Sequence, residues 1–223
     1  FKDRHCLESD PHRVLEGALI AAWTIEAEAV YIYLRDEYST LHDVLHREIA
    51  RIKEAGLTDG VEVHVRRGAG AYVCGEESAM LESLEGKRGL VRAKPPLPAH
   101  EGLFGKPTVV NNVLSLCAVP TILAEGAAFY RDFGVGRSRG TQPFQLAGNI
   151  RYPGLFETGF GVTLHDLIYR FGGGTLSGRP VRAAQVGGPL GSYLPESLFH
   201  LPKDYEVFTE HEAIVGHGGI VVF

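Results

Sequence analysis

The apolar residues between positions 14 and 34 change from helical spacing to strand spacing. From Val14 to Trp23 they recur every three to four positions, which predicts one buried face of a helix. Asp10 and Pro11 supply a capping residue and a proline at the first helical position. Residues 29–34 (AVYIYL) are a continuous run of β-branched and aromatic side chains, which predicts a strand buried on both faces.

A second helix and a second strand follow. The apolar stripe from Leu41 to Ile52 predicts a helix that Thr40 caps and Gly56 ends. Residues 61–65 (VEVHV) alternate between apolar and polar side chains, which predicts another strand. The order helix, strand, helix, strand is typical of an α/β layer with a largely parallel sheet.

The region from 68 to 140 is punctuated by glycine and proline. A glycine-rich loop over 68–77 (GAGAYVCGEE) precedes a short helix that ends at Gly86, and the proline-rich connector 94–98 (KPPLP) excludes a helix or a central strand. Residues 107–112 lead into another helical run, for which Asn111 or Asn112 is the expected cap and Pro120 a break. Glycines and arginines over 134–140 predict a linker.

After residue 140 the pattern changes to short strands. Strands are predicted over 143–150 and 155–160, with turn residues between them. Thr163 is the expected cap of a short helix ended by three glycines, and strands follow over 181–186 and 213–223. A hairpin, one helix and a returning strand predict a β-grasp, or ubiquitin-like, unit.

Composition and charge exclude several classes of protein. Hydrophobic residues make up 44% and charged residues 22%, and the net charge is −5, which argues against disorder and against a nucleic-acid binder. No apolar run reaches the length of about 18 residues that a membrane helix needs. Three widely spaced cysteines exclude a disulfide scaffold and favour a reducing, cytoplasmic compartment.

Because the chain begins at Phe1 and its only methionine is Met80, we expect a piece of a longer protein.

The glycine-rich loop is the first candidate for chemistry. Gly68, Gly70 and Gly75 let backbone N–H groups approach a ligand, and the start of the next helix suits a phosphate. The spacing matches neither the dinucleotide-binding glycine motif nor the phosphate-binding loop. On the pattern alone, glycines that serve only the turn are the commoner explanation.

Glu76 and Glu77 follow this loop directly. Two carboxylates in a first helical turn stabilise a helix through its dipole by about 0.3–1 kcal/mol each, which is a purely structural role. They would also repel a bare anion, so a ligand would more readily bring a ring to them, and a carboxylate beside a redox ring disfavours its anionic reduced form. The spacing does not choose between these two interpretations.

The remaining polar residues give weaker signals. One cap needs one asparagine, so the second of Asn111 and Asn112 is available for another hydrogen bond, and Lys94 beside the diproline could reach an anion. His42 and His46 lie four residues apart, but no third ligand is evident, and the chain has no Cys-x-x-Cys. No metal site is therefore predicted in this chain.

Several motifs together resemble one protein family. They are GAGAYVCGEES at 68–78, LESLEG at 81–86, KPP at 94–96, GKPT at 105–108 and VNNV at 110–113. These stretches resemble the flavoprotein, 51-kilodalton-type subunit of respiratory complex I, whose family includes the diaphorase (beta) subunits of NAD-reducing hydrogenases and of soluble NAD-dependent formate dehydrogenases. The resemblance runs from FKDR at 1–4 through the whole chain, and GHGGIVV at 216–222 leans towards the formate dehydrogenase branch.

The resemblance implies a fold, cofactors and a site. It implies a partial Rossmann-like FMN- and NADH-binding domain over residues 1–138 and a β-grasp domain of the soluble-ligand-binding (SLBB) type over 139–223. In this family FMN takes a hydride from NADH and passes electrons singly to iron–sulfur clusters. The cofactor-binding residues that it implies, with Glu77 near the nicotinamide and in the catalytic role, are Gly68, Gly70, Tyr72, Gly75, Glu76, Glu77, Lys94, Val110, Asn111 and Asn112.

The family pattern also implies parts and partners outside this chain. Its first glycine-rich loop is expected upstream, and the cysteines that ligate its 4Fe–4S cluster are expected downstream. The expected partners are a 24-kilodalton-type iron–sulfur subunit and a larger electron-transfer complex, without insertion into the membrane. This chain departs from the common pattern at Leu97, where many members have an aromatic residue, and at Leu114, where many have Glu.

Two functions of different classes follow. The first is part of an NADH dehydrogenase (diaphorase) flavoprotein subunit that passes a hydride between NAD(H) and FMN. The second is a non-catalytic binding or assembly module that contacts partner subunits through the β-grasp domain. The presence of the upstream glycine loop in the parent reading frame would favour the first.

Overall fold

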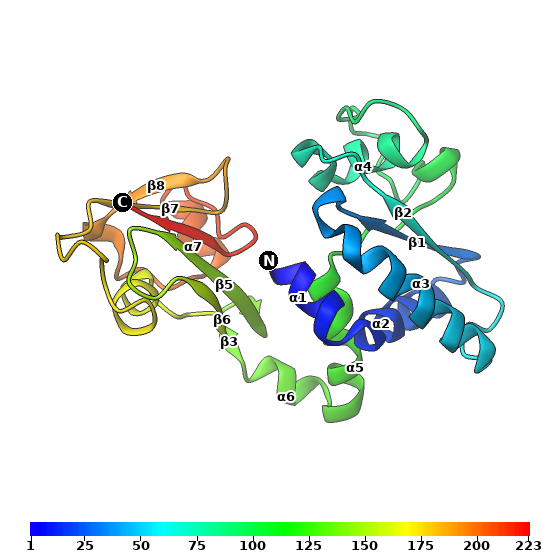
Figure 1. The fold of residues 1–223 in the computed structure, drawn as a ribbon, viewed down its shortest axis with the longest axis horizontal. Helices are drawn as coiled ribbons and strands as arrows, with labels where there is room; N and C mark the ends of the chain where they lie inside the picture. The colour runs from blue at the N-terminus through cyan, green and yellow to red at the C-terminus, as the bar shows by residue number, and fades with distance from the viewer. The chain divides into compact units, whose positions relative to one another are not determined.

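The computed structural model describes residues 1–223, which form two compact units (Figure 1). The first unit is Asp3–Pro120, and the second unit is Thr121–Phe223 together with Phe1 and Lys2. None of the helices combines the length and the apolar character that a membrane crossing requires.

The first unit alternates helices and strands, as predicted. Its elements are α1 (Lys2–Ser9), α2 (Pro11–Thr24), β1 (Ala29–Leu34), α3 (Ser39–Glu54), β2 (Glu62–Arg67), α4 (Glu77–Leu84) and α5 (Val113–Glu125), of which α5 continues into the second unit. The two strands pair in parallel, with Ala29 opposite Glu62 and Leu34 opposite Arg67. The prediction of parallel pairing is confirmed, in a two-stranded sheet.

The core of the first unit lies on one face of this sheet. Leu34 and Val65 from the strands join side chains from α1, α2 and α3, namely Leu7, Val14, Leu41 and Leu45. Strand side chains alternate between the two faces, so the neighbours Tyr31 and His64 stack outside this core with ring centroids 4.8 Å apart. The hydrophobic pattern therefore predicted correctly the buried face of α3 and most of that of α2. Two expectations are wrong: Trp23 at the end of α2 is 74% exposed, and β1 is not buried on both faces, because Tyr31 on the face away from this core is exposed.

The two predicted helix starts have different outcomes. The side chain of Asp10 accepts a hydrogen bond from the Arg13 N–H at 3.1 Å, which confirms the cap of α2. The cap predicted for α3 is wrong, because the helix begins at Ser39 and Tyr38 occupies the capping position without a side-chain hydrogen bond. A short 3₁₀ turn runs straight into α3, so the chain is already helical before Thr40.

Helix α5 passes through the proline that was predicted to break it. Pro120 lies inside the helix, and the turns on either side keep their hydrogen bonds, from Leu116 N–H to the Asn112 carbonyl and from Gly126 N–H to the Ile122 carbonyl. The side-chain oxygen of Asn112 accepts from the Leu114 N–H at 3.0 Å. Of the two candidate caps, Asn112 is therefore the one that begins α5.

The predicted linker over 134–140 is wrong as well. Residues Gly134–Val135 (β3) and Ser138–Arg139 (β4) pair as a short antiparallel hairpin, preceded by helix α6 (Ala127–Arg131). Gly134 and Gly140 have φ values of 93° and 83°, a conformation that glycine adopts without the penalty of a Cβ. The glycines here end and turn a small sheet rather than loosening the chain.

Five strands make the sheet of the second unit. They are β5 (Thr141–Gly148), β6 (Gly154–Gly159), β7 (Ala183–Val186), β8 (Ser192–Pro195) and β9 (Gly219–Val222), arranged in the order β6-β5-β9-β7-β8 (Figure 1). The last strand lies in the middle, parallel to β5 and antiparallel to β7. Strand β8 and helix α7 (Tyr205–Glu210) were not predicted, because four and six residues are too few to show a period.

A helical segment after β6 packs on this sheet. The chain over Asp166–Phe171 forms a π-helical turn, and the Thr163 hydroxyl accepts from the Asp166 N–H at 3.0 Å, which confirms the predicted cap. Leu164, Leu167 and Ile168 are fully buried against the sheet. The core of the second unit is therefore separate from that of the first.

Candidate functional site

The glycine-rich loop leaves the sheet where both parallel strands of the first unit end. The Gly68 N–H donates to the Leu34 carbonyl at 2.7 Å, so the loop starts beside the end of β1. At this end of the sheet, Nε of Arg67, the last residue of β2, lies 2.6 Å from Oδ1 of Asp36, which follows β1 by two residues. The carboxyl edge of a parallel sheet is where α/β proteins bind ligands, and the loop occupies that edge.

The three loop glycines differ in what requires them. A Cβ on Gly68 would lie 2.6 Å from the hydroxyl of Tyr33, so a side chain here requires the Tyr33 ring to move. Gly70 has a φ of 81°, in the left-handed region that favours glycine. Around Gly75 a Cβ would meet nothing within 4 Å, so the space beside this residue is open. The fold favours glycine at the first two positions, whereas nothing in the fold favours it at the third.

Backbone donors in the loop are available to a ligand. The N–H groups of Ala69, Gly70 and Ala71 make no hydrogen bond within the protein. The Tyr72 side chain, next in sequence, is 53% exposed. Three successive free N–H groups beside an exposed aromatic ring can bind an oxygen-rich ligand that also carries a ring.

Glu76 occupies the start of α4. Its Oε2 accepts from the Ala79 N–H at 2.9 Å and from the Ser78 hydroxyl at 2.6 Å. Burial raises the pKa of this carboxyl, but the hydrogen bonds from Ser78, Ala79 and Lys94 outweigh it and lower the pKa to about 2. A carboxylate of the protein therefore already accepts a hydrogen bond at the helix start that the sequence suggested as suitable for a phosphate.

Lys94 joins the two adjacent acids. Its Nζ lies 3.2 Å from Glu76 Oε1 and also donates a hydrogen bond to Glu77 Oε1. Hydrogen bonds from Lys94 to Glu77 and then to Glu76 raise the pKa of the lysine. The side chains of all three residues are between 33% and 38% exposed. The sequence placed Lys94 near the acids only by resemblance, and the structure brings the three charges together.

A second polar network holds the Lys94 segment against α4, and the sequence analysis missed it. The Ser78 hydroxyl accepts from the Arg92 N–H at 2.9 Å, and the Arg92 guanidinium pairs with Glu82 at 2.6 Å and with Glu85 at 2.8 Å. Glu85 also accepts from the Phe104 N–H at 2.8 Å. A signal in the sequence could have revealed this network. Glu82 and Glu85 lie three residues apart, and Arg92 follows them shortly before Lys94.

The asparagine segment belongs to another element of the first unit, the start of α5. Val110 is partly exposed, and Asn111 and Asn112 are exposed, just before α5. Asn112 caps that helix, whereas the Asn111 side chain makes no hydrogen bond within the protein. No hydrogen bond or ion pair joins Val110 or Asn111 to Glu76, Glu77 or Lys94. The structure thus brings seven of the ten candidates into one loop-and-lysine site and leaves three on a separate segment.

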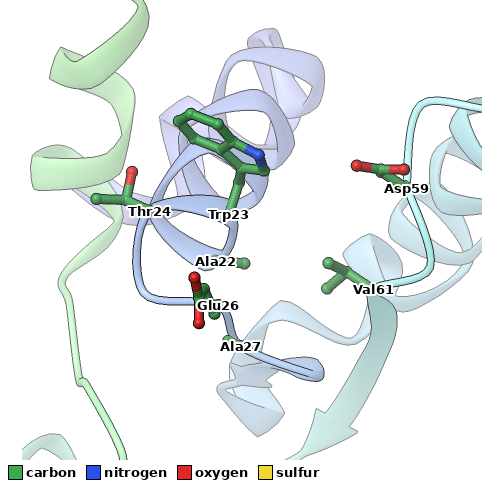
Figure 2. Close-up of a pocket in the computed structure, with 7 residues that line it drawn as sticks. All are labelled: Ala22, Trp23, Thr24, Glu26, Ala27, Asp59 and Val61. Carbon is green, nitrogen blue, oxygen red and sulfur yellow. The ribbon is translucent and has the colours of Figure 1, made fainter.

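One surface hollow of the first unit lies away from the candidate residues. It is at the amino ends of β1 and β2, where the exposed Trp23 ring and Asp59 flank it (Figure 2). Its lining residues are Ala22, Trp23, Thr24, Glu26, Ala27, Asp59 and Val61. None of the candidate residues contributes to it, so this hollow is not the candidate site.

The histidine pair forms no larger cluster. The Nε2 atoms of His42 and His46 are 3.3 Å apart on α3, and their rings make an edge contact. No group of three or more histidine, cysteine or carboxylate side chains in residues 1–223 could hold a metal ion.

Comparison with known proteins places this loop-and-lysine arrangement in a family. Residues 1–121 match the model of the Nuo51 FMN-binding domain, the complex I 51-kilodalton family. This match covers more than half of the chain and includes the glycine loop, the paired acids, Lys94 and both asparagines. The chain therefore belongs to the complex I 51-kilodalton flavoprotein family.

Similar proteins match over the whole chain. The F 2 subunit of NADH-quinone oxidoreductase in Rhizobium meliloti is 44% identical over 100% of this chain and 55% of its own length. The HndC subunit of the NADP-reducing hydrogenase in Solidesulfovibrio fructosivorans is 39% identical over 100% of this chain and 47% of its own. A crystal structure of an air-oxidized NAD⁺-reducing NiFe hydrogenase matches with a TM-score of 0.88 and 40% identity, covering 100% of this chain and 37% of that one. The chain spans about half the length of the curated relatives it matches.

Proposed function

We propose that this chain supplies part of the site at which a flavoprotein subunit passes a hydride between NAD(H) and FMN and sends electrons on to iron–sulfur clusters. The observation that carries this proposal is the convergence of Glu76, Glu77 and Lys94 beside the free N–H groups of the glycine loop. Family membership supports it, since the matched domain is described as FMN-binding. The activity proposed is that of the whole protein, of which this chain is one part.

The residues of the site fit a flavin. The N–H groups of Ala69, Gly70 and Ala71 are suited to the oxygens of the ribityl and phosphate groups, and the open space at Gly75 allows the backbone to approach a flat ring. Bound FMN would supply the ability to take up a hydride and release single electrons. In this proposal Val110, Asn111 and Asn112 approach the same cofactor from their own segment.

The acids and the lysine have separate tasks. Glu76 holds the loop to α4 as its cap, and Glu77 projects from the first helical turn, where it can contact the nicotinamide or the flavin ring. Lys94 pairs with both, so the site presents two acids with one compensating positive charge. This balance lowers the repulsion of a nucleotide phosphate by the carboxylates.

Residues 139–223, which lie within the second unit, are proposed to be a β-grasp domain of the SLBB type. Its strand order, with the last strand parallel to the first in the middle of the sheet, supports this proposal. We further propose that the whole protein works in the cytoplasm with a 24-kilodalton-type iron–sulfur subunit in a complex I-like or NAD-dependent formate dehydrogenase complex. The names of the relatives, which are oxidoreductase and hydrogenase subunits, support a larger complex of this kind.

Glu77→Gln in the whole protein tests the proposed site. We expect NADH oxidation with ferricyanide to show a several-fold change in kcat or KM, while the loss of the helix-dipole interaction costs only about 0.3–1 kcal/mol of stability. The matched control is Glu206→Gln, which removes an exposed acid from the first turn of α7 in the second unit. Unchanged kinetics together with a large drop in melting temperature would contradict the proposal, and a whole protein that binds no FMN would favour a binding module instead.

A further inference from the structure

Away from the proposed flavin site, two histidine side chains meet on the surface of α3. His42 and His46 lie one helical turn apart, and their Nε2 atoms are 3.3 Å from each other. The two rings make an edge contact with centroids 4.4 Å apart. The side chain of His42 is 39% exposed and His46 is exposed, so the pair lies at the surface of the unit.

The core of the unit does not use this pair. Leu41 and Leu45, each one position before a histidine, belong to the core cluster of the first unit. Neither histidine belongs to that cluster. Packing therefore does not explain why two imidazoles stand one turn apart on this helix.

The distance between the two nitrogens fits a tetrahedral metal ion. Zinc lies about 2.0–2.1 Å from each imidazole nitrogen that binds it, and at the tetrahedral angle two such nitrogens are about 3.3 Å apart. At the right angle of a square-planar ion they would be closer, about 2.9 Å apart. The observed separation of 3.3 Å is therefore the spacing that a tetrahedral zinc ion requires.

An acid lies beside the other nitrogen of the first ring. Oδ1 of Asp43 is 3.6 Å from Nδ1 of His42, the ring nitrogen that does not face His46. A carboxylate in this position favours a proton on Nδ1, which leaves the lone pair of Nε2 for a metal. The guanidinium of the neighbouring Arg47 pairs with Glu48 at 2.8 Å. The negative charge next to the pair therefore comes from Asp43.

We propose that His42 and His46 bind one zinc ion through their Nε2 atoms. No third histidine, cysteine or carboxylate completes a metal-binding group in residues 1–223, so water fills the remaining positions on the ion. Without zinc, one Nε2 carries a proton that the other accepts. When zinc binds, that ring takes the tautomer with its proton on Nδ1, and both Nε2 lone pairs face the metal.

A zinc ion at this pair would hold two successive turns of α3 together. The same turns carry Leu41 and Leu45 into the core, so fixing them favours the folded unit. An ion that binds the folded helix more tightly than the unfolded chain stabilises the protein by mass action. Magnesium prefers oxygen ligands, so it should have no such effect.

A zinc titration of the chain tests the proposal. Calorimetry measures the affinity, and the imidazole Cε1–H resonances in NMR spectra identify the histidines that bind. We expect zinc to shift the resonances of His42 and His46 and to raise the melting temperature, whereas magnesium should do neither. No binding at millimolar zinc would overturn the proposal, and so would shifts confined to other histidines.

Three variants identify the ligands. His42→Asn and His46→Asn should each weaken zinc binding by about tenfold or more, because each removes one of two ligands that act as a chelate. His5→Asn is the matched control, since it removes an exposed helical histidine that has Ser9, not a second histidine, one turn further on. All variants keep the three cysteines, so zinc bound by thiols would be unchanged among them.

Equal zinc affinity in His42→Asn, His46→Asn and the original protein would place the ion elsewhere and overturn the proposal. A loss of affinity in His5→Asn as large as in the other two variants would do the same. If a variant fails to fold, the NMR titration of the original protein decides which histidines bind.

Discussion

Gly17 of α2 lies directly against the backbone carbonyl of Leu116 in α5. A Cβ built on Gly17 would be 2.0 Å from the Leu116 oxygen. That carbonyl is the one that a residue at position 120 would normally bond in a helix, and Pro120 has no N–H to offer. The two helices therefore approach each other closely at the point where α5 lacks a hydrogen bond.

Gly17→Ala should destabilise the first unit even though alanine is the better helix former. In an open helix the exchange would stabilise by roughly 0.5–1 kcal/mol, but here the methyl group must push α2 away from α5, at a cost of about 1–3 kcal/mol. Thermal or urea unfolding of the variant measures the balance. A variant as stable as the original protein, or more stable, would show that the two helices separate easily.

Gly75→Ala should lower FMN occupancy without lowering stability. The fold leaves open space at Gly75, so a methyl group meets only a bound ligand. Flavin absorbance per purified whole protein and a melting curve are the measurements. Gly159→Ala is the control, because it adds a methyl group with only ordinary contacts in the second unit. Full flavin occupancy in Gly75→Ala would leave Gly75 as a turn residue only.

Glu76→Ala should cost stability, in contrast to Glu77→Gln. Removing the cap of a helix costs about 0.5–2 kcal/mol. The pKa of Glu76 is lowered to about 2, so its contribution is present above its ordinary pKa of about 4.3 and is lost as the pH falls towards 2. Unfolding between pH 2 and 6 should therefore show a smaller pH dependence in Glu76→Ala than in the original protein. Parallel curves would mean that this cap contributes nothing measurable.

The second unit should become more stable as the pH rises above 7, because its buried Lys203 loses its proton more readily in the folded than in the unfolded chain. Its Nζ is fully buried without a hydrogen-bond acceptor, 4.4 Å from the centre of the Phe208 ring, and burial lowers its pKa to about 7. The unfolded chain binds this proton up to about pH 10.4, so between pH 7 and 10.4 the unfolded state holds more protons and stability rises with pH. The gain across this window is on the order of 4 kcal/mol.

Lys203→Met isolates this effect from other groups that titrate in the same window. Methionine fills a similar volume without a charge, so the variant should be more stable at pH 7, and the difference should shrink as the pH approaches 10. Urea unfolding at several pH values provides the comparison. A difference that does not change with pH would mean that Lys203 carries the same charge in the folded and unfolded states.

Long periodic elements were predictable, and short ones were not. Residues 29–34 gave the bounds of β1 without error, because six consecutive residues, mostly β-branched or aromatic, have one interpretation. The prediction of a break at Pro120 was wrong because the local sequence shows the lost hydrogen bond but not the hydrogen-bonded turns on both sides, which hold the helix together. The hairpin at 134–140 was missed because its paired stretches are two residues each.

The site was predictable in its residues more than in their arrangement. Glycines and paired acids stood out by type, yet only the structure distinguishes Glu76, which caps α4, from Glu77, which does not. Ser78 and Arg92, which fix the position of the Lys94 segment, carry no local signal, because their partners are up to fourteen residues away. Long-range hydrogen bonds of this kind leave no period in the sequence.

The central position of β9 has a consequence for the order in which the chain is made. Strands β5 and β6 form one hairpin and β7 and β8 another, and only β9 joins the two. During synthesis the two hairpins therefore leave the ribosome before the strand that connects them exists. Until Val222 emerges, the two hairpins cannot join into one sheet. Their apolar faces therefore have to avoid contacts with other chains during that interval.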